Sequence, residues 1–448
     1  MDCTKFVQFR RDISACFTRA GAALFDLSDA LLTEHTADTF IALSQAPCFQ
    51  RRWPSLYAAL RDGQIDHAAL RRTFVAALPC PPIGQRLLLG LDTSPIRRPD
   101  ARTSRDRTLV YWPNLPRDAT PVVPGWSFSA LVVLPQPVSS WTYVLDHQRV
   151  PSSQTAVTVG TQQLQLVLPL LPTRALLLLD RHYSQAPWLL ATDHLPVDQL
   201  IRARVDQVLY RPPPPRSGKV GAPRKDGARF KGSEPTTHGV PDDEWQGTDA
   251  HGHPIQVSCW KQLHSRKARQ VSITAIRIVR PQAQASKRDP REAWFWWVGG
   301  DLPALAEVAT FYPHRFGQEH GYRFDKQDLR WAAPHVRTPE QMQRWTDLVA
   351  VVRNELVLAQ SLVAGERRPW ERRRQVTTPR QVRRAMGRLI MQLGTPVAPP
   401  QVRGKAPGRA RGAVVKPATR YAVIRKSPPK PKKRDNRASI AAPVVQRC

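Results

Sequence analysis

Two acidic residues of this chain stand where their carboxylates could act together on a metal ion or a phosphate. Asp92 follows the apolar run 87–91, and Asp180 follows the apolar run 175–179. Both runs are typical of strands that are buried on both faces. The ends of adjacent strands in a parallel or mixed sheet open into one crevice, so we expect the two acids to share a site. For either acid alone, a polar residue that merely follows a strand is an equally good explanation.

A third acid, Glu319, lies in a segment that also carries Tyr312, Arg315 and Lys326. If a helix begins at Pro313, a turn of about 100° per residue places these four side chains on one narrow face. An aromatic ring, two cations and an acid suit an anionic ligand that lies beside a metal. The simpler alternative is a surface ion pair between Arg315 and Glu319, which contributes little. Two glycines, at 317 and 321, disfavour the helix.

The spacing Tyr-x2-Arg-x3-Glu-x6-Lys resembles the signature of the DDE transposases of bacterial insertion sequences, and the segment 312–326 matches all four positions. The resemblance implies an RNase H-like fold in which Asp92, Asp180 and Glu319 are the three catalytic acids. It also implies a β-strand insertion between the second and third acids. The longer gap of this chain, between Asp180 and Glu319, contains such a segment.

By the same resemblance, the three carboxylates bind two Mg²⁺ ions, for which Mn²⁺ can substitute, and no other cofactor is expected. Two divalent ions about 3.5–4 Å apart can activate the attacking oxygen and stabilise the leaving oxygen of a phosphodiester. Magnesium prefers oxygen ligands. Tyr312, Arg315 and Lys326 would contact the DNA backbone, where a guanidinium binds phosphate through two hydrogen bonds.

The composition indicates a polyanionic partner. The 448 residues include 67 Lys and Arg against 36 Asp and Glu, a net charge of +31, which makes nucleic acid the first candidate. The resemblance narrows this partner to double-stranded DNA. No apolar run approaches the roughly 18 residues of a membrane span, and charges interrupt the N-terminus before a signal sequence could form. The six cysteines form no C-x-x-C pair. We therefore expect a cytoplasmic protein with no membrane contact, and the resemblance implies that it lies on the bacterial nucleoid.

The sequence predicts an α/β protein with five regions. Residues 1–80 form a helical N-terminal region, a candidate for recognition of DNA ends. Residues 81–210 form the first part of an RNase H-like, mixed-sheet catalytic core, with strands near 87–91, 126–134, 141–145 and 175–179 and a helix over 154–168. A β-rich insertion spans 211–300 and begins at four consecutive prolines.

Residues 301–393 supply the second part of the core and the C-terminal helices. One helix begins at Thr338, because Thr338 and Gln341 have the spacing of a capping box around Pro339. Residues 394–448 are expected to be a disordered basic tail, since 401–448 hold fourteen Lys and Arg against a single Asp.

Several weaker signals have simpler explanations. The run Trp294–Trp297 could stack an unpaired base, although a buried strand accounts for it more cheaply. Asp146 and Asp206 lie near strand ends and are reserve acids, expected to be ordinary turn residues. Four arginines of the helical stretch 379–390 could contact phosphates or form a solvated face; they are Arg380, Arg383, Arg384 and Arg388.

Together these features predict a DNA transposase that hydrolyses phosphodiesters and transfers strands at the ends of an insertion sequence. It would act on transposon ends and target DNA as a homodimer, because two ends must be brought together. Two alternatives stay open. The chain could be an RNase H-like endonuclease without strand transfer, or a catalytically inactive, transposase-derived DNA-binding protein.

Overall fold

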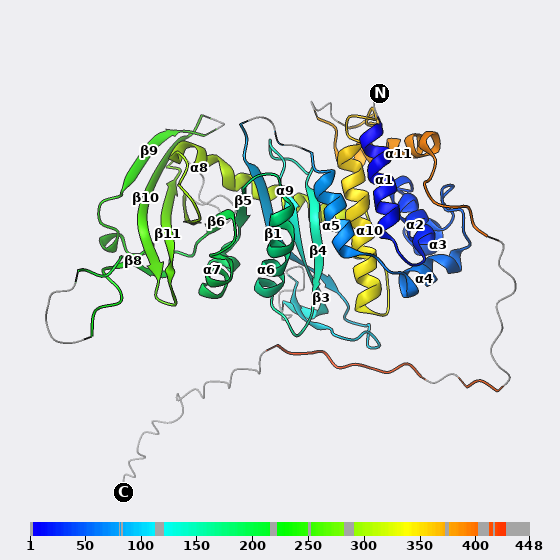
Figure 1. Cartoon of the computed structure of the whole chain (residues 1–448), viewed down its shortest axis with the longest axis horizontal. Helices are drawn as coiled ribbons and strands as arrows, with labels where there is room; N and C mark the ends of the chain where they lie inside the picture. The colour runs from blue at the N-terminus through cyan, green and yellow to red at the C-terminus, as the bar shows by residue number, and fades with distance from the viewer. Residues whose placement is uncertain are drawn as a thin grey trace, which may run out of the picture.

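The computed structural model describes residues 3–79, 81, 84–112, 121–215, 222–249, 252–281, 291–371, 376–401, 412–414 and 417–426. Twelve strands of these residues form one mixed sheet that runs through the length of the molecule (Figure 1). The N-terminal helices gather at one end, and a group of long antiparallel strands forms the other end.

Five strands make the central part of the sheet, in the order β4-β3-β1-β5-β6. Strand β1 pairs antiparallel with β3 and parallel with β5, β3 pairs antiparallel with β4, and β5 pairs parallel with β6. This is the order of an RNase H-like core, which confirms the predicted fold class. The strands are β1 (Leu87–Arg97), β3 (Val122–Val133), β4 (Tyr143–Val150), β5 (Ala175–Leu179) and β6 (Val197–Arg202).

Burial follows the apolar runs of the sequence. Residues 87–91 of β1 and all of β5 are buried, as expected for strands covered on both faces. Helix α6 (Ala156–Val167), capped by the Thr155 side chain, packs on β3 and β4. Helix α7 (Ala186–Thr192) follows β5, and the short strand β2 (Thr108–Tyr111) pairs with the start of β3.

The β-rich segment continues the central sheet. Strand β12 pairs antiparallel with β6, and β11 and β10 follow it in order. The tryptophans at 294–297 lie on β12 and are buried, and Trp294 stacks on Trp260 with ring centroids 5.5 Å apart. These rings are therefore part of the core and do not form a base-stacking platform. The strands of this segment are β7 (Val208–Tyr210), β8 (Arg229–Lys231), β9 (Asp243–Thr248), β10 (Pro254–Ser265), β11 (Ala268–Val279) and β12 (Glu292–Val298).

Helix α10 (Pro339–Leu358) covers the edge strand β4. It begins at the predicted capping box of Thr338 and Gln341. The Asn354 amide accepts from Val144 N and donates to Val144 O, both at 2.8 Å. An edge strand whose backbone is bonded in this way is closed to further pairing. Before α10 come α8 (Leu305–Phe311), the 3₁₀ turn η4 (Tyr312–Arg315) and α9 (Phe316–Gln327).

Five N-terminal helices pack beside α10: α1 (Thr4–Cys16), α2 (Gly21–Thr33), α3 (Phe40–Leu43), α4 (Trp53–Asp62) and α5 (His67–Ala76). Arg10 of α1 is buried and donates to Asp29 at 2.7 Å and to Glu355 of α10 at 2.9 Å. Because a buried charge is costly unless paired, these bonds hold the helices in one arrangement against α10. In the described part of the chain, no helix has the length and hydropathy that crossing a membrane requires.

The arginines of α11 (Pro379–Leu393) bond within the protein. Arg383 is buried and donates to the carbonyl oxygens of Leu31 and Glu34. The expectation that this helix contacts phosphates is therefore wrong for Arg383. Its other arginines also face acids of the chain, in the pairs Arg380–Asp328, Arg384–Glu371 and Arg388–Glu366.

Part of the basic tail lies on the sheet. Ile424 forms a parallel bridge with Thr108 of β2, and Arg107 donates to Tyr421 O at 3.0 Å. Residues 402–411, 415–416 and 427–448, which belong to the tail predicted as disordered, lie outside the described residues.

Candidate active site

The pairing of β1 with β5 brings Asp92 and Asp180 to the same level of the sheet. Leu87 pairs with Ala175 and Gly90 with Leu178, and the same offset sets Asp92 opposite Asp180 two residues further on. Neighbouring strands lie about 4.8 Å apart, and level residues point to the same face. The two acids that the sequence singled out therefore meet at the level where β5 ends. The expectation that Asp92 also ends its strand is wrong, because β1 stays paired with β3 as far as Arg97.

Arg202 continues this row on the next strand. Ile201 of β6 pairs with Leu179, so Arg202 follows level with Asp180. Its guanidinium carbon lies 5.7 Å from the centre of the Tyr312 ring. Sequence reasoning missed Arg202 because 197–202 was not recognised as a strand. The available signal was again an apolar run, 200–201, followed by a charged residue.

Arg315 connects Glu319 to Asp92. Its Nη1 donates to Glu319 Oε1 at 3.0 Å, and its Nη2 donates to Asp92 Oδ2 at 2.7 Å. The Arg315 side chain is 10% exposed, whereas that of Glu319 is 53% exposed. The ion pair between Arg315 and Glu319 exists, but because it extends to Asp92 it is more than an isolated surface pair.

Helix α9 is seated closely enough to reach β1 because it carries glycine where it meets other elements. A Cβ at Gly321 would lie 1.6 Å from Nη2 of Arg353. Arg353 itself is paired with Asp325 at 2.7 Å, and Gln318 donates to Ala130 O of β3 at 2.9 Å. The glycines that argued against a helix therefore permit its position.

The outer members of the four-residue signature lie to either side of Arg315. Tyr312 is buried against Phe295, with ring centroids 4.7 Å apart. Lys326 donates to Pro95 O at 3.1 Å, three residues beyond Asp92 on β1, and its burial lowers its pKa to about 8. Arg315 and Lys326 thus reach β1, whereas Tyr312 lies against β12 and β6. The expected helix begins after Arg315, because residues 312–315 form a 3₁₀ turn.

Negative charge is concentrated around Asp92. Burial raises the pKa of Asp92 to about 6, and the nearby carboxylates of Asp180 and Glu319 add to the increase, although Arg315 opposes it. Two bonds fix the acids: Thr93 N donates to Asp92 Oδ1 at 2.7 Å, and His182 N donates to Asp180 Oδ1 at 2.9 Å. Asp92 and Asp180 are thus held in place, and the Arg315 guanidinium offsets part of their negative charge.

Tyr183 was not identified from the sequence. It ends the 3₁₀ turn η2 (Arg181–Tyr183) that directly follows Asp180. Its hydroxyl is buried and has no partner in the described structure. Burial, followed by the charges of Asp92 and Asp180, raises the pKa of this hydroxyl well above its usual value. The hydroxyl is therefore neutral and keeps a proton that no described group accepts. The available signal in the sequence was an aromatic residue three places after Asp180.

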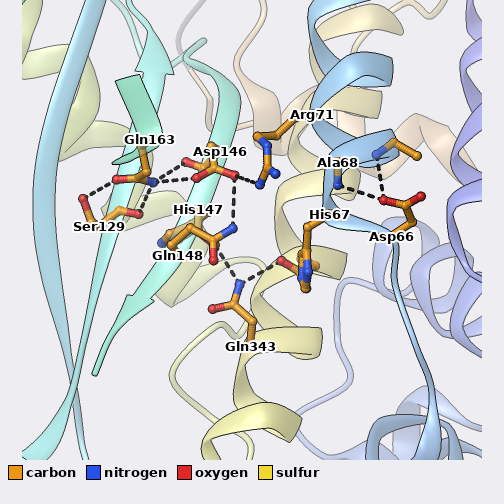
Figure 2. Close-up of polar contacts among 12 residues, drawn as sticks. Asp66, His67, Ala68, Arg71, Ser129, Asp146, His147, Gln148, Gln163 and Gln343 are labelled. Atoms are coloured by element: carbon orange, nitrogen blue, oxygen red, sulfur yellow. Dashed lines mark hydrogen bonds and ion pairs between the residues drawn. The ribbon is translucent and has the colours of Figure 1, made fainter. Parts of the chain in front are cut away.

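The reserve acids do not join this site. Asp206 lies exposed in a turn, as expected. Asp146 was also expected in a turn, but it is buried on β4, where it accepts from Arg71 at 3.2 Å and from Gln163 at 2.9 Å (Figure 2). Its carboxylate belongs to a polar network between α5 and the sheet.

The donor chemistry of the site suits a hard divalent cation. Asp92, Asp180 and Glu319 offer only carboxylate oxygens, the ligand type that such ions prefer. In this conformation, no three acidic, histidine or cysteine side chains of the described ranges are close enough to hold a metal, and the Arg315 guanidinium bridges Asp92 and Glu319. A cation bound by the acids would offset the same charge that Arg315 offsets here.

Comparison with known proteins gives the family. A sequence profile described as DDE superfamily endonuclease matches residues 12–266, more than half of the chain. The chain belongs to the DDE superfamily endonucleases. Members of this superfamily act on DNA and generally use divalent metals. The matched span includes Asp92 and Asp180 and ends before Glu319. No curated protein matches the chain.

Proposed function

We propose that this DDE endonuclease is a DNA transposase that hydrolyses phosphodiesters at the ends of an insertion sequence and then transfers the freed strands to target DNA. The observation that carries the proposal is the register of β1 and β5, which sets Asp92 level with Asp180 beside Glu319 and Arg315. Two of these carboxylates stand at buried strands and the third on the neighbouring helix α9, although like charges at close range repel one another. They suit a reaction on a polyanion with a divalent metal.

Asp92, Asp180 and Glu319 would hold two Mg²⁺ ions, with Mn²⁺ as a substitute, and the bound ions would activate the attacking oxygen and stabilise the leaving oxygen. The cationic side chains of the protein would bind the phosphates of the DNA. Arg202 lies level with Asp180 and can bind the phosphate next to the one that is cut. Arg315 can exchange its bonds to the acids for bonds to a phosphate, since guanidinium fits both anions.

The regions of the chain divide this work. Residues 81–210 and 301–393 form the catalytic core, in which Tyr312 and Lys326 lie along the DNA backbone, and 211–300 form the β insertion. Residues 1–80 would recognise the DNA ends, and two copies of the chain would hold the two ends together. The net charge of +31 favours binding to the nucleoid.

The test is an assay of cleavage and joining. The substrate is a plasmid that carries the gene with its flanking DNA, so that the natural ends are present, and Mg²⁺ or Mn²⁺ is supplied. Wild type should nick the DNA at the ends of the element and join those ends to a second plasmid. Asp92→Asn and Glu319→Gln should abolish both reactions and retain DNA binding. Asp206→Asn, which alters an exposed acid outside the site, should behave as wild type.

The outcomes separate the proposal from its alternatives. Cleavage without joining, also when pre-cut ends are supplied, would indicate an endonuclease without strand transfer. DNA binding without metal-dependent cleavage in the wild type would indicate an inactive descendant. Full activity in both acid variants would remove the three carboxylates from the mechanism.

A further inference from the structure

A basic cavity lies at the end of β1 that is farther from the N-terminal start of the strand, beyond Asp92. It has a volume of about 680 Å³ and is lined by the segment 97–104, by Trp112 and by the segment 332–337. Arg97 stands five residues beyond Asp92 on the same strand, which is about 16 Å at the rise of a β-strand. We call this space the Arg98 cavity, after the buried arginine in its wall.

Arg98 is a buried cation without an acidic partner. It is 5% exposed, and among the described residues its Nη2 donates to Pro334 O and to the sulfur of Met342 at 3.3 Å. Its guanidinium carbon lies 5.5 Å from the centre of the Trp126 ring, which offsets part of the charge. Its Nε has no partner, and within the described residues no carboxylate lies at ion-pair distance. Burial lowers its pKa to about 10. A buried charge without an acidic partner is costly, so an anion bound at this wall of the cavity would offset the charge of Arg98.

The neighbouring arginines add to the excess of positive charge. Arg97 and Arg337 line the cavity and are exposed. Arg107 is buried close by, and its hydrogen bonds to other described residues go to carbonyl oxygens, including Ser104 O at 3.2 Å and Arg98 O at 3.0 Å. Among the described lining residues the one acid is Asp100. The cavity therefore has several guanidinium groups for one carboxylate.

An aromatic ring completes the cavity. The guanidinium carbon of Arg97 lies 4.6 Å from the centre of the Trp112 ring, and Lys326 Nζ lies 5.7 Å from the same centre. Lys326 also bonds to Pro95 O on β1, between Asp92 and the cavity. Lys326 and Arg97 thus place positive charge between Asp92 and the Arg98 cavity.

We propose that the Arg98 cavity binds a backbone phosphate of the same DNA molecule that is cut at Asp92. This inference rests on the proposed function. A DNA backbone that follows β1 from the carboxylates reaches the cavity within a few nucleotides. Arg97 and Arg337 hold the phosphate at the mouth, and the charge of Arg98 is offset when the anion is bound. Such a contact fixes the DNA without reading its sequence.

The experiment measures binding, so that it does not depend on cleavage. A short labelled duplex from the end of the element is titrated in EDTA with wild type, with the double variant Arg97→Ala/Arg337→Ala and with Arg102→Ala. Arg102 is the matched control, because it is an exposed arginine of the same segment that does not line the cavity. The double variant should bind roughly tenfold more weakly, and the slope of log affinity against log salt should fall in magnitude by about 1, the change expected for one lost phosphate contact. Arg102→Ala should change both far less.

A second measurement locates the contact. Single neutral methylphosphonate linkages are placed along the duplex, and each duplex is titrated with wild type and with the double variant. One linkage should weaken the wild type but not the double variant, because the cations that contact that phosphate are already absent. Equal sensitivity of both proteins at every linkage would overturn the proposal. A wild type that does not bind DNA would instead contradict the proposed function.

Inorganic phosphate separates DNA from a small anion. If inorganic phosphate raises the melting temperature of the wild type but not of the double variant, while both bind DNA equally, the cavity serves a free anion and the proposal is wrong. If DNA is the ligand, the double variant must bind DNA more weakly than wild type, irrespective of the effect of inorganic phosphate on the melting temperature. Arg98 is not altered in these tests, because its bonds to Pro334 and Met342 also support the fold.

Discussion

Arg315 donates one hydrogen bond to Asp92 at 2.7 Å and one to Glu319 at 3.0 Å, so that one guanidinium joins the strand and the helix that carry these acids. The carboxylates raise the pKa of Arg315 above its usual value, although burial alone would lower it. The guanidinium is therefore charged and competes with any cation for the same oxygens. Removal of the Arg315 side chain should therefore affect metal binding and cleavage, which loss of a surface ion pair would not.

We expect Arg315→Ala to bind Mn²⁺ more tightly than wild type while losing cleavage. The metal no longer competes with a guanidinium, but the phosphate loses a ligand. The measurement is the loss of the free Mn²⁺ signal in electron paramagnetic resonance. It is made near pH 8, about two units above the pKa of Asp92, so that this acid is ionised in the wild type. Arg323→Ala, which removes an exposed arginine of the same helix, is the control. Weaker Mn²⁺ binding by Arg315→Ala would contradict the competition.

Tyr183→Phe tests the unpartnered hydroxyl beside Asp92 and Asp180. Because the hydroxyl is buried without a hydrogen bond, its removal should leave the free energy of unfolding unchanged or increase it by about 1 kcal/mol. If the hydroxyl orients a carboxylate or the attacking water, the cleavage rate should fall by about tenfold or more.

The two readouts for Tyr183→Phe are independent. Urea unfolding reports on stability, and single-turnover cleavage reports on the reaction. A variant that is destabilised and equally active would show that the hydroxyl has a structural role only.

The fold and the site differ in how far the sequence could predict them. The apolar runs that end at Asp92 and Asp180 predicted both strands, and their common register then followed from parallel pairing. The capping box at Thr338 is a local signal and predicted the start of α10. Local patterns of this kind are readable because they depend on neighbours in the chain.

Other features depend on contacts between distant segments and were not readable. The bond from Arg315 to Asp92 spans 223 residues, and Arg202 enters the site only because β6 pairs with β5. Asp146 was misplaced in a turn, because its partners Arg71 and Gln163 come from two helices that no local pattern brings to β4. The periodicity of the sequence cannot predict which polar residues are buried by tertiary contacts.

The His67–Asp347 pair predicts a pH dependence of stability. His67 Nε2 lies 3.0 Å from Asp347 Oδ2 in the polar network between α5 and α10 (Figure 2). The hydrogen bond and charge of Asp347 raise the pKa of His67 above 6.5, with a smaller contribution from Asp146; burial and Arg71 oppose the increase. The stabilisation is therefore complete below pH 6.5 and is lost as the pH rises through the folded-state pKa.

This prediction is measured by urea unfolding of wild type, His67→Gln and Asp347→Asn at a series of pH values on both sides of 6.5. The stability advantage of wild type over His67→Gln should be largest at the acid end of the series and decline towards the alkaline end. Asp347→Asn should show little of this decline, since the histidine has lost its acid. An advantage that grows with pH would reverse the sign and refute the assignment.

Gly321→Ala tests whether the close seating of α9 positions Glu319 and Arg315. The new Cβ would lie 1.6 Å from Arg353 Nη2, so the helix or the buried Arg353–Asp325 pair must move. Overpacking of this kind costs about 1–3 kcal/mol.

Gly387→Ala is the matched control, because a Cβ at this helical position of α11 meets nothing within 4 Å and should stabilise the protein by about 0.5–1 kcal/mol. Thermal unfolding gives both stabilities, and cleavage is assayed at a temperature where both variants are folded. We expect folded Gly321→Ala to lose cleavage, because a displaced α9 carries Glu319 and Arg315 away from Asp92. Gly387→Ala should keep full activity. Equal activity of the two variants would mean that the site tolerates this displacement.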